Sequence, residues 1–521
     1  MASGPQSLGW IGRTGIAFAV SVPTIILLSV AAIISVAEAG SGLTSGDWAA
    51  LRFTIWQATL SAVISVLLAV PLARALARRN FVGRGVVITL LGAPFLLPVI
   101  VAVFGLLAVF GRNGVLNAVL ETFAFEPISI FGLHGVVLAH VFFNLPLATR
   151  FILQGWQEIP AERFRLAASL GMDTQAINRH LEWPMLKKVL PCAFVVIFAV
   201  CTTTFAVALI LGGGPRATTV ELAIYQSLRF EFDLRRAAFL ALMQIGIMVL
   251  LAFIAHRILA PALLSHRMDR PVIRWDGRGF AIRMIDYGVI VGAIGFLLMP
   301  ITMVMIQGLP KILSLPAVVW ESLFRSLIVA VSSTIIVLGI LIPMSYAAAR
   351  RPRQSVWIES AGLMSFAVSS LVLGTGLFVV INPIMRPDML ALPITALVNA
   401  LATLPFALRS VLPAFCQAEA DYGRLADSIG LTPWARLKFI FLQRSKREIG
   451  FIAGLAAALS MGDLGVITLF ALPDTPTLPL QIYRLMGAYR MQEAAGASVL
   501  LLLCSFGLFW LLDQGARRVE I

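Results

Sequence analysis

Residues 160–171 read Pro-Ala-Glu-Arg-Phe-Arg-Leu-Ala-Ala-Ser-Leu-Gly, and residues 419–430 read Glu-Ala-Asp-Tyr-Gly-Arg-Leu-Ala-Asp-Ser-Ile-Gly. The glycines that end these stretches, Gly171 and Gly430, lie 259 positions apart in a chain of 521 residues. A self-match of this length at one fixed offset, close to half the chain, indicates an internal duplication. The sequence therefore predicts two copies of one structural unit.

Each copy of this stretch has the signals of two short helices broken at a glycine. Pro160 suits the first turn of a helix, where its missing N–H is no loss, and Gly171 can take the left-handed conformation that ends one. Asp173 is placed to cap the second helix, and Pro184 is expected to stop it. In the second copy, Thr432 and Pro433 are the capping pair. We expect a polar helix–glycine–helix segment in both halves of the chain.

One face of the first of these helices is apolar. Leu166 and Leu170 lie one helical turn apart, with Ala167 and Ala168 beside them. The small alanine side chains leave a notch between the larger ones. Such a face suits contact with the side chains of another protein.

The remaining sequence is too apolar for a soluble domain. Apolar residues make up 59% of the chain and the mean hydropathy is +0.92. A membrane-spanning helix needs about 20 mostly apolar residues, and short alternating strands typical of a β-barrel are missing. We predict an all-α integral membrane protein of about twelve transmembrane helices, arranged as two tandem six-helix repeats. The predicted spans are 15–36, 53–76, 86–110, 131–154, 189–212, 236–259, 284–307, 323–347, 357–382, 390–412, 448–471 and 495–513.

The spans divide the chain into two repeats and a linker. The first repeat is expected at 1–260 with its polar loop near 158–184, and the second at 284–521 with its loop near 417–443. Residues 261–283 are Arg-rich and too polar to span a membrane, so we interpret them as a cytoplasmic linker.

The net charge of +14 raises the possibility of nucleic-acid binding. Most of the 40 basic residues, however, lie in segments on one side of the predicted spans. Such an asymmetry sets the orientation of a membrane protein, with the basic side in the cytoplasm. We therefore expect cytoplasmic N- and C-termini and no nucleic-acid partner.

Sequence signals of catalysis and metal binding are missing. The chain contains no Gly-Lys dipeptide, which excludes a P-loop for nucleotide phosphates. Five scattered histidines do not form a metal-binding pattern, and four single cysteines form no CxxC pair. We expect no catalytic residue, no metal site and no cofactor in this chain.

Several polar or irregular positions lie within the apolar spans, where ionisable groups are costly and often mark a transport pathway. Asp463 could meet a cation in transit, or could be solvated and bonded to the adjacent glycine backbone. His140 and Asn144 share a helix face and either line a pathway or join two helices by hydrogen bonds. The run Gly212, Gly213, Gly214 is either a moving gate or a tight loop.

The spacing of the polar loops resembles a known motif. Membrane subunits of bacterial ATP-binding-cassette (ABC) importers carry the pattern E-A-A-x-x-x-G-x(9)-I-x-L-P, and both copies here match its spacing around their glycines. Arg165 and Arg424 replace the glutamate of the motif, and Gln443 replaces its final proline. Glu162 and Asp421 could supply a carboxylate nearby.

A second stretch narrows the resemblance. Residues 212–226 read Gly-Gly-Gly-Pro-Arg-Ala-Thr-Thr-Val-Glu-Leu-Ala-Ile-Tyr-Gln, and this run is similar to permeases of thiamine importers. Residues 98–105, 139–146 and 182–184 are similar to the same family. The loop pattern by itself is also compatible with other importers, and duplicated permeases of iron(III) importers are the nearest alternative.

The resemblance implies the type I ABC importer fold and a transport role in the bacterial inner membrane. ATP and Mg²⁺ would bind to two copies of a separate ATPase subunit, and thiamine, or its phosphate esters, would arrive from a periplasmic thiamine-binding protein. Membrane lipid would surround the spans. The residues that the resemblance assigns to ATPase coupling are Glu162, Arg165, Leu166, Ala167, Ala168 and Gly171 in the first loop, and Asp421, Arg424, Leu425, Ala426 and Gly430 in the second.

Two functions of other classes stay open. A twelve-span secondary transporter also contains repeats and intramembrane polar groups, although it has no use for paired cytoplasmic coupling loops. A membrane-anchored regulator would use its basic loops to bind nucleic acid, with a strong salt dependence.

Overall fold

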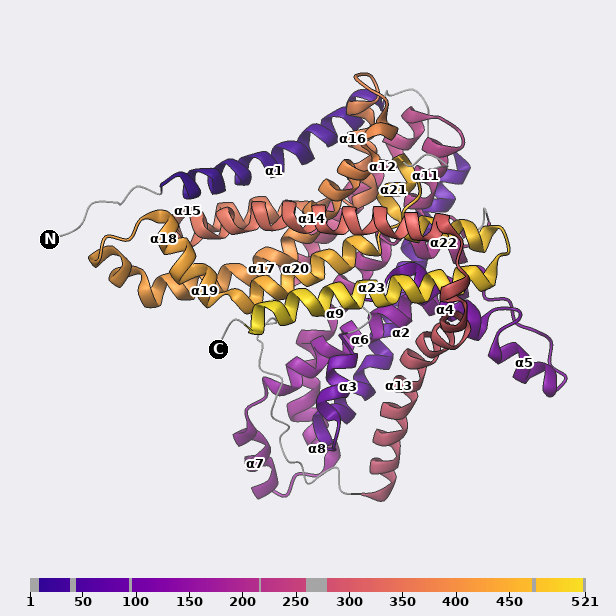
Figure 1. Ribbon diagram of the computed structural model, residues 1–521. Helices are drawn as coiled ribbons and strands as arrows, with labels where there is room; N and C mark the ends of the chain where they lie inside the picture. The colour runs from indigo at the N-terminus through magenta and orange to yellow at the C-terminus, as the bar shows by residue number, and fades with distance from the viewer. Residues whose placement is uncertain are drawn as a thin grey trace.

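The computed structural model describes residues 9–37, 44–92, 96–214, 217–258, 279–470 and 475–518, and within these ranges the chain is helical without strands (Figure 1). Among the described residues, eleven helices are long and apolar enough to cross a membrane, or twelve if the bent pair α15–α16 counts as one span. The predicted all-α membrane architecture is confirmed.

The described helices of the first half follow the predicted order. They are α1 (Gly9–Val36), α2 (Ser45–Arg78), α3 (Arg84–Leu90), α4 (Val99–Phe110), α5 (Val115–Thr122), α6 (Leu133–Gln157), α7 (Ala161–Ser169), α8 (Thr174–Ile177), the π-helix η2 (Asn178–Glu182), α9 (Trp183–Thr202), α10 (Phe205–Leu211), α11 (Val220–Arg229) and α12 (Leu234–Ile258).

The second half repeats this order with few changes. Its elements are α13 (Phe280–Gly308), η4 (Leu309–Ser314), α14 (Ala317–Arg350), α15 (Pro352–Leu363), η5 (Met364–Ala367), α16 (Ser370–Ile381), η6 (Pro387–Leu390), α17 (Ala391–Ser428), α18 (Pro433–Arg436), the π-helix η7 (Leu437–Phe441), α19 (Leu442–Arg444), α20 (Lys446–Met461), α21 (Gly465–Phe470), α22 (Leu478–Gly487) and α23 (Met491–Arg518). Most of the predicted linker lies outside the described residues.

Several predicted spans are interrupted rather than continuous. The span predicted at 86–110 is divided into α3 and α4, and Pro98 precedes α4, where a residue without an N–H suits the start of a helix. The spans predicted at 189–212 and 448–471 both break before their ends, between α9 and α10 and between α20 and α21. Because the two breaks fall at matching positions of the two repeats, they belong to the repeated architecture.

The first helix of each repeat packs on the other repeat. Helix α1 lies along α14 and α16, and α13 lies along α4 and α2 (Figure 1). The indole of Trp10 in α1 stacks on that of Trp434 in α18, with ring centroids 6.4 Å apart. Arg79, just after α2, pairs with Asp286 of α13 at 2.7 Å. The two repeats therefore interlock.

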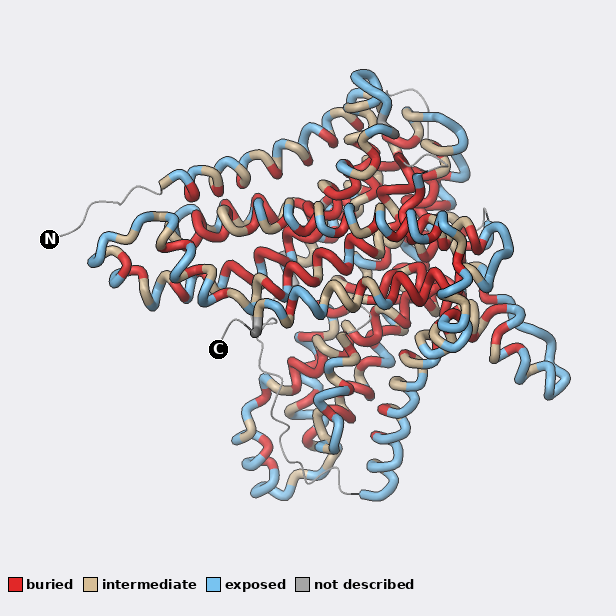
Figure 2. The backbone as a smooth tube through the Cα atoms, in the orientation of Figure 1, coloured by how far each residue is buried: buried red, intermediate tan, exposed pale blue. Residues whose placement is uncertain are grey.

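The remaining long helices form two diverging groups. Helices α2, α6 and α9 run toward the lower left of Figure 1 and end near α7 and α8, whereas α14, α17, α20 and α23 run toward the left and end near α18 and α19. Figure 2 shows that buried residues are concentrated where the groups converge. The two polar loops thus lie at separate tips, and the repeats meet at the opposite end.

Candidate functional site

The glycines of both polar loops adopt the predicted left-handed conformation. The φ angles are +63° at Gly171 and +66° at Gly430. The amide N–H of Met172 donates to the carbonyl oxygen of Ala167, and that of Leu431 to Ala426, at 3.0 Å in each case. These bonds close the helix ends in the Schellman pattern. Nothing lies within 4 Å of where a Cβ would stand at either glycine, so backbone conformation selects glycine here.

The predicted caps of the second helices are also confirmed. The Asp173 carboxylate accepts a hydrogen bond from the Ala176 N–H at 2.8 Å, and the Thr432 hydroxyl accepts one from Ala435 at 3.3 Å. The prediction that Pro184 stops its helix is wrong. Proline occupies the first turn of α9, where its missing N–H is tolerated, and the π-helix η2 joins α8 to α9 without a break.

The first helix of the second loop is not separate from its span. Helix α17 continues unbroken from Ala391 to Ser428, whereas in the first repeat α6 ends at Gln157 and α7 begins at Ala161. Glu419 stands where the first copy has Pro160, and it retains the N–H that proline lacks. The second loop is therefore a rigid extension of its span.

The predicted apolar face is exposed in both loops. The exposed fractions are 60% for Leu166 and 68% for Leu170, and 58% and 63% for their counterparts Leu425 and Ile429. Ala168 is exposed beside them, as are the charged residues Glu162, Arg165, Asp421 and Arg424. Ala167 is instead buried, which corrects its expected place in the notch, and its counterpart Ala426 is buried as well.

An ion pair between a buried carboxylate and a partly exposed arginine anchors the first loop to its repeat. Arg74 near the end of α2 lies 2.7 Å from Glu182 at the end of η2. The indole N–H of Trp156 in α6 donates to the same carboxylate at 3.3 Å. Because η2 has π-helical geometry, it carries Glu182 into this contact while the chain remains helical.

The second loop has an aromatic anchor at the same place. Phe441, at the end of η7, corresponds to Glu182 at the repeat offset, and its ring packs on Phe415 and Tyr346 with centroids 4.9 and 5.2 Å apart. At the same offset, Phe415 corresponds to Trp156. Tyr346 corresponds to Arg74 when the ends of α2 and α14 are matched by aligning Arg78 with Arg350. A polar anchor in one repeat is thus replaced by an apolar one in the other.

Charges hold the second loop at a different point. The buried guanidinium of Arg436 in α18 lies 2.7 Å from Glu419 and 2.5 Å from Asp427, both in α17. Arg350 at the end of α14 pairs with Glu419 at 2.9 Å. The positions of Arg436, Glu419 and Asp427 are occupied by Ile177, Pro160 and Ala168 in the first loop. We call Arg350, Glu419, Asp427 and Arg436 the Arg436 cluster.

His140 and Asn144 lie in helix–helix contacts. The ring nitrogens of His140 are 3.2 Å from the Ser61 hydroxyl of α2 and 2.7 Å from the Thr204 hydroxyl at the break before α10. The Asn144 amide donates to the His140 carbonyl at 2.9 Å and contacts Cys201. These bonds join α2, α6 and the α9–α10 break.

Asp463 lies in the matching break between α20 and α21. One carboxylate oxygen accepts from the Gly465 N–H at 3.2 Å, which agrees with the predicted bond to the glycine backbone. The other oxygen, Oδ2, is buried and has no hydrogen-bond partner among the described residues. At the repeat offset, Asp463 corresponds to Thr204, and Asn399 of α17 to His140.

Gly212, Gly213 and Gly214 form an irregular turn after α10. The backbone φ angle is +73° at Gly213 and +126° at Gly214. The Gly132 N–H donates to the Leu211 carbonyl at 2.8 Å, and a Cβ on Gly213 would stand 3.0 Å from that of Phe131. The turn therefore packs closely on the start of α6. Pro215 lies outside the described residues.

Sequence reasoning did not single out Glu221 in the first turn of α11. Its side chain is only 2% exposed, and Oε1 has no hydrogen-bond partner among the described residues. The available signal was the motif at 212–226, which contains this residue. The pattern identified a family but did not show that the carboxylate is buried.

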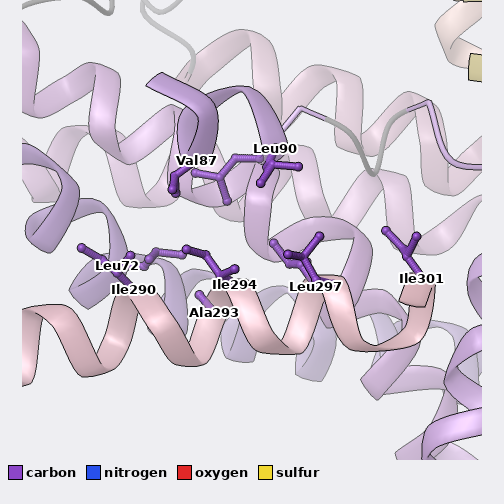
Figure 3. Close-up of a pocket in the computed structure, with 10 residues that line it drawn as sticks. Leu72, Val87, Leu90, Ile290, Ala293, Ile294, Leu297 and Ile301 are labelled. Atoms are coloured by element: carbon purple, nitrogen blue, oxygen red, sulfur yellow. The ribbon is translucent and has the colours of Figure 1, made fainter. Parts of the chain in front are cut away.

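A cavity between α2, α3 and α13 has a different character (Figure 3). Its lining is entirely apolar and includes Leu72, Val87, Leu91, Ile290 and Leu297. It offers no partner to a charged or polar solute. Within the described ranges, no group of three or more His, Cys, Asp or Glu side chains is arranged to hold a metal ion.

No protein-family model matches the chain. Curated proteins do match it over nearly its whole length. A thiamine transport system permease protein of Escherichia coli K12 is 38% identical over 481 residues, which cover 90% of this chain and 89% of the relative. The proteins of the same name from Brucella abortus and Haemophilus influenzae are 34% and 32% identical, over 92% and 87% of this chain and 90% and 86% of the relatives.

Proposed function

The chain belongs to the family of thiamine transport system permease proteins, and we propose that ATPase subunits docked on its two polar loops drive it. It is a multi-pass inner-membrane protein and the permease subunit of a thiamine ABC importer. The proposal concerns how the chain is driven and what it assembles with. The single observation that carries it is the pair of exposed apolar faces, one on each loop.

Two copies of an ATPase subunit would bind these faces. Leu166 in α7 and Leu170 directly after it present a pair of apolar side chains one turn apart. Leu425 in α17 and Ile429 directly after it present the same pair. Four large exposed apolar residues at equivalent places of a duplicated loop favour protein contact over membrane contact, because the surrounding loop surface is charged. ATP and Mg²⁺ would be held by these subunits, not by this chain.

The orientation follows from charge. The loops, the linker and the chain ends carry most of the basic residues, so we place them in the cytoplasm by the positive-inside rule. A periplasmic thiamine-binding protein would then meet the opposite side, where α5 and the turn at Gly212 lie.

Transport would proceed by rocking of the two helix groups. The two groups diverge toward the loops, so the loops lie apart and could approach each other in such a movement (Figure 1). ATP would bring the ATPase subunits together, and the loops would move with them as rigid bodies. ATP must bind one arrangement better than the other for this to happen, since equal affinity shifts no equilibrium.

The proposal is tested by ATP hydrolysis in a reconstituted complex of permease, ATPase and binding protein. Stimulation by the thiamine-loaded binding protein, and not by an iron-loaded binding protein, is the expected result. Thiamine uptake by the chain without any associated ATPase would contradict the proposed coupling and favour a secondary transporter. Stimulation by the iron-loaded protein alone would contradict thiamine as the substrate.

A further inference from the structure

Two buried carboxylates, Glu221 and Asp463, lie in neighbouring elements that pack near two aromatic rings where the repeats meet. Phe205 begins α10, and its ring lies 5.2 Å from the ring of Tyr225 in α11. Glu221 is one helical turn before Tyr225, so both side chains share a face of α11. Phe205 Cδ1 is also 3.7 Å from where a Cβ on Gly465 would stand, two residues after Asp463. Phe205 therefore lies beside the Tyr225 ring, one turn after Glu221, and beside the turn that follows Asp463.

The two repeats both contribute to this cluster. Glu221, Phe205 and Tyr225 come from the first repeat and Asp463 from the second. Ser369, the N-cap of α16 in the second repeat, lies near Glu221 across the boundary. The cluster thus bridges two bodies that would move relative to each other during transport.

The duplication shows that the fold does not require these charges. Helices α11 and α22 begin alike: the Val220 N–H donates to the Thr54 hydroxyl at 2.9 Å, and the Leu478 N–H to the Ser326 hydroxyl at 2.8 Å. The second repeat nevertheless has Pro479 where the first has Glu221. In the same way, the first repeat has the neutral Thr204 where the second has Asp463. In both cases the other repeat forms the corresponding helix start without a carboxylate.

Keeping a carboxylate buried at this depth is costly unless it has a partner. Each of these two has an oxygen without a hydrogen-bond partner among the described residues. The nearby helix N-termini offset part of this cost. The corresponding helix starts at Pro479 and Thr204 have N-termini of the same kind, but they carry no carboxylate. A positively charged solute is the partner that would use both carboxylates.

We propose that Glu221, Asp463, Phe205 and Tyr225 bind the cationic ring of the substrate at the boundary between the repeats. The inference rests on the proposed function, because thiamine carries a permanent positive charge on its thiazolium ring. Aromatic faces attract such quaternary cations, most strongly where water is excluded. The site closes around the thiazolium ring of the substrate when the two repeats come together, and it opens when they separate.

The test compares Glu221→Gln and Asp463→Asn with the wild type in proteoliposomes that contain the ATPase and binding protein. Each variant keeps the size of the side chain and removes its charge. We expect thiamine uptake to fall by about tenfold or more, as the loss of one desolvated charge interaction implies. Stimulation of ATP hydrolysis by the loaded binding protein is expected to persist. Glu359→Gln, which neutralises a half-exposed carboxylate on α15 outside both polar loops, is the control and should transport normally.

The conservative variants Glu221→Asp and Asp463→Glu separate charge from packing, and partial recovery of uptake would support the proposal. Wild-type uptake in both neutral variants would overturn it. Loss of stimulated ATP hydrolysis together with uptake in both would also overturn it, because the residues would then be needed for assembly. A failure of the proposed function is distinguishable, since it would appear in the wild-type complex as missing thiamine uptake.

Discussion

Glu182 lies 2.7 Å from Arg74, and in the second repeat the two corresponding positions are Phe441 and Tyr346, whose rings are 5.2 Å apart. One duplicated joint is therefore built with an ion pair in one copy and with aromatic packing in the other. The Arg436 cluster shows the opposite exchange, with charges in the second loop where the first has apolar residues. Both loops are fastened to their spans, but at different points.

The ion pair predicts an uneven response to the removal of its partners. Arg74→Tyr removes the guanidinium that lies 2.7 Å from the buried Glu182 carboxylate, which is expected to destabilise the protein by about 3 kcal/mol. Glu182→Phe should cost less, because Arg74 is partly exposed and can reach water. The double variant, which copies the aromatic anchor of the second repeat, is expected to regain most of the stability. Thermal unfolding in detergent measures all three, and strictly additive losses would contradict the prediction.

The Arg436 cluster predicts that the second loop depends on charge. Arg436→Ile introduces the residue found at this place in the first loop and leaves Glu419 and Asp427 with Arg350 as the remaining cation. Both carboxylates are partly exposed, so we expect a loss of about 2 kcal/mol in unfolding free energy. Transport per ATP hydrolysed should fall while the ATPase still co-purifies. Ile177→Val in the first loop is the control, and equal losses in both variants would argue against this difference.

The exposed leucines predict which substitutions break assembly. Leu166→Asp and Leu425→Asp place a charge in each apolar face and should abolish co-purification of the ATPase, since a charge buried at an interface without a partner is costly. Leu313→Asp is the matched control because this leucine is almost fully exposed in η4, outside both loops. Retention of the ATPase by the double variant would show that the subunit binds elsewhere.

The left-handed glycines predict a graded effect of side-chain shape. Gly171→Val and Gly430→Val place a β-branched residue at a φ near +65°, where such residues are strained by about 1–2 kcal/mol or more. Gly→Asn at the same positions is tolerated better, because asparagine adopts this conformation more readily. The ratio of thiamine transported to ATP hydrolysed should fall in the valine variants and stay near wild type with asparagine. Equal ratios in all four would show that the turn is not needed for coupling.

The local geometry of the loops was predictable from sequence because it depends on near neighbours. The turn at Gly171, the cap at Asp173 and the cap at Thr432 each involve hydrogen bonds that reach no more than five residues along the chain. The number of spans was predictable for a similar reason, since apolar length is a property of each segment. Pro184 was misjudged because the π-helix before it, which carries the chain into α9, has no simple sequence signal.

By itself, the sequence determined the duplication, the membrane architecture and the helix–glycine–helix form of the loops. Only the tertiary structure decided that α1 and α13 cross to the opposite repeat, that Arg74 meets Glu182, and that Phe205 lies near both Tyr225 and the turn at Gly465. These contacts join residues far apart in the chain, and they depend on how whole helices pack and where they break. A repeat offset shows which positions correspond, but packing decides whether a charge, an aromatic ring or a proline can occupy them.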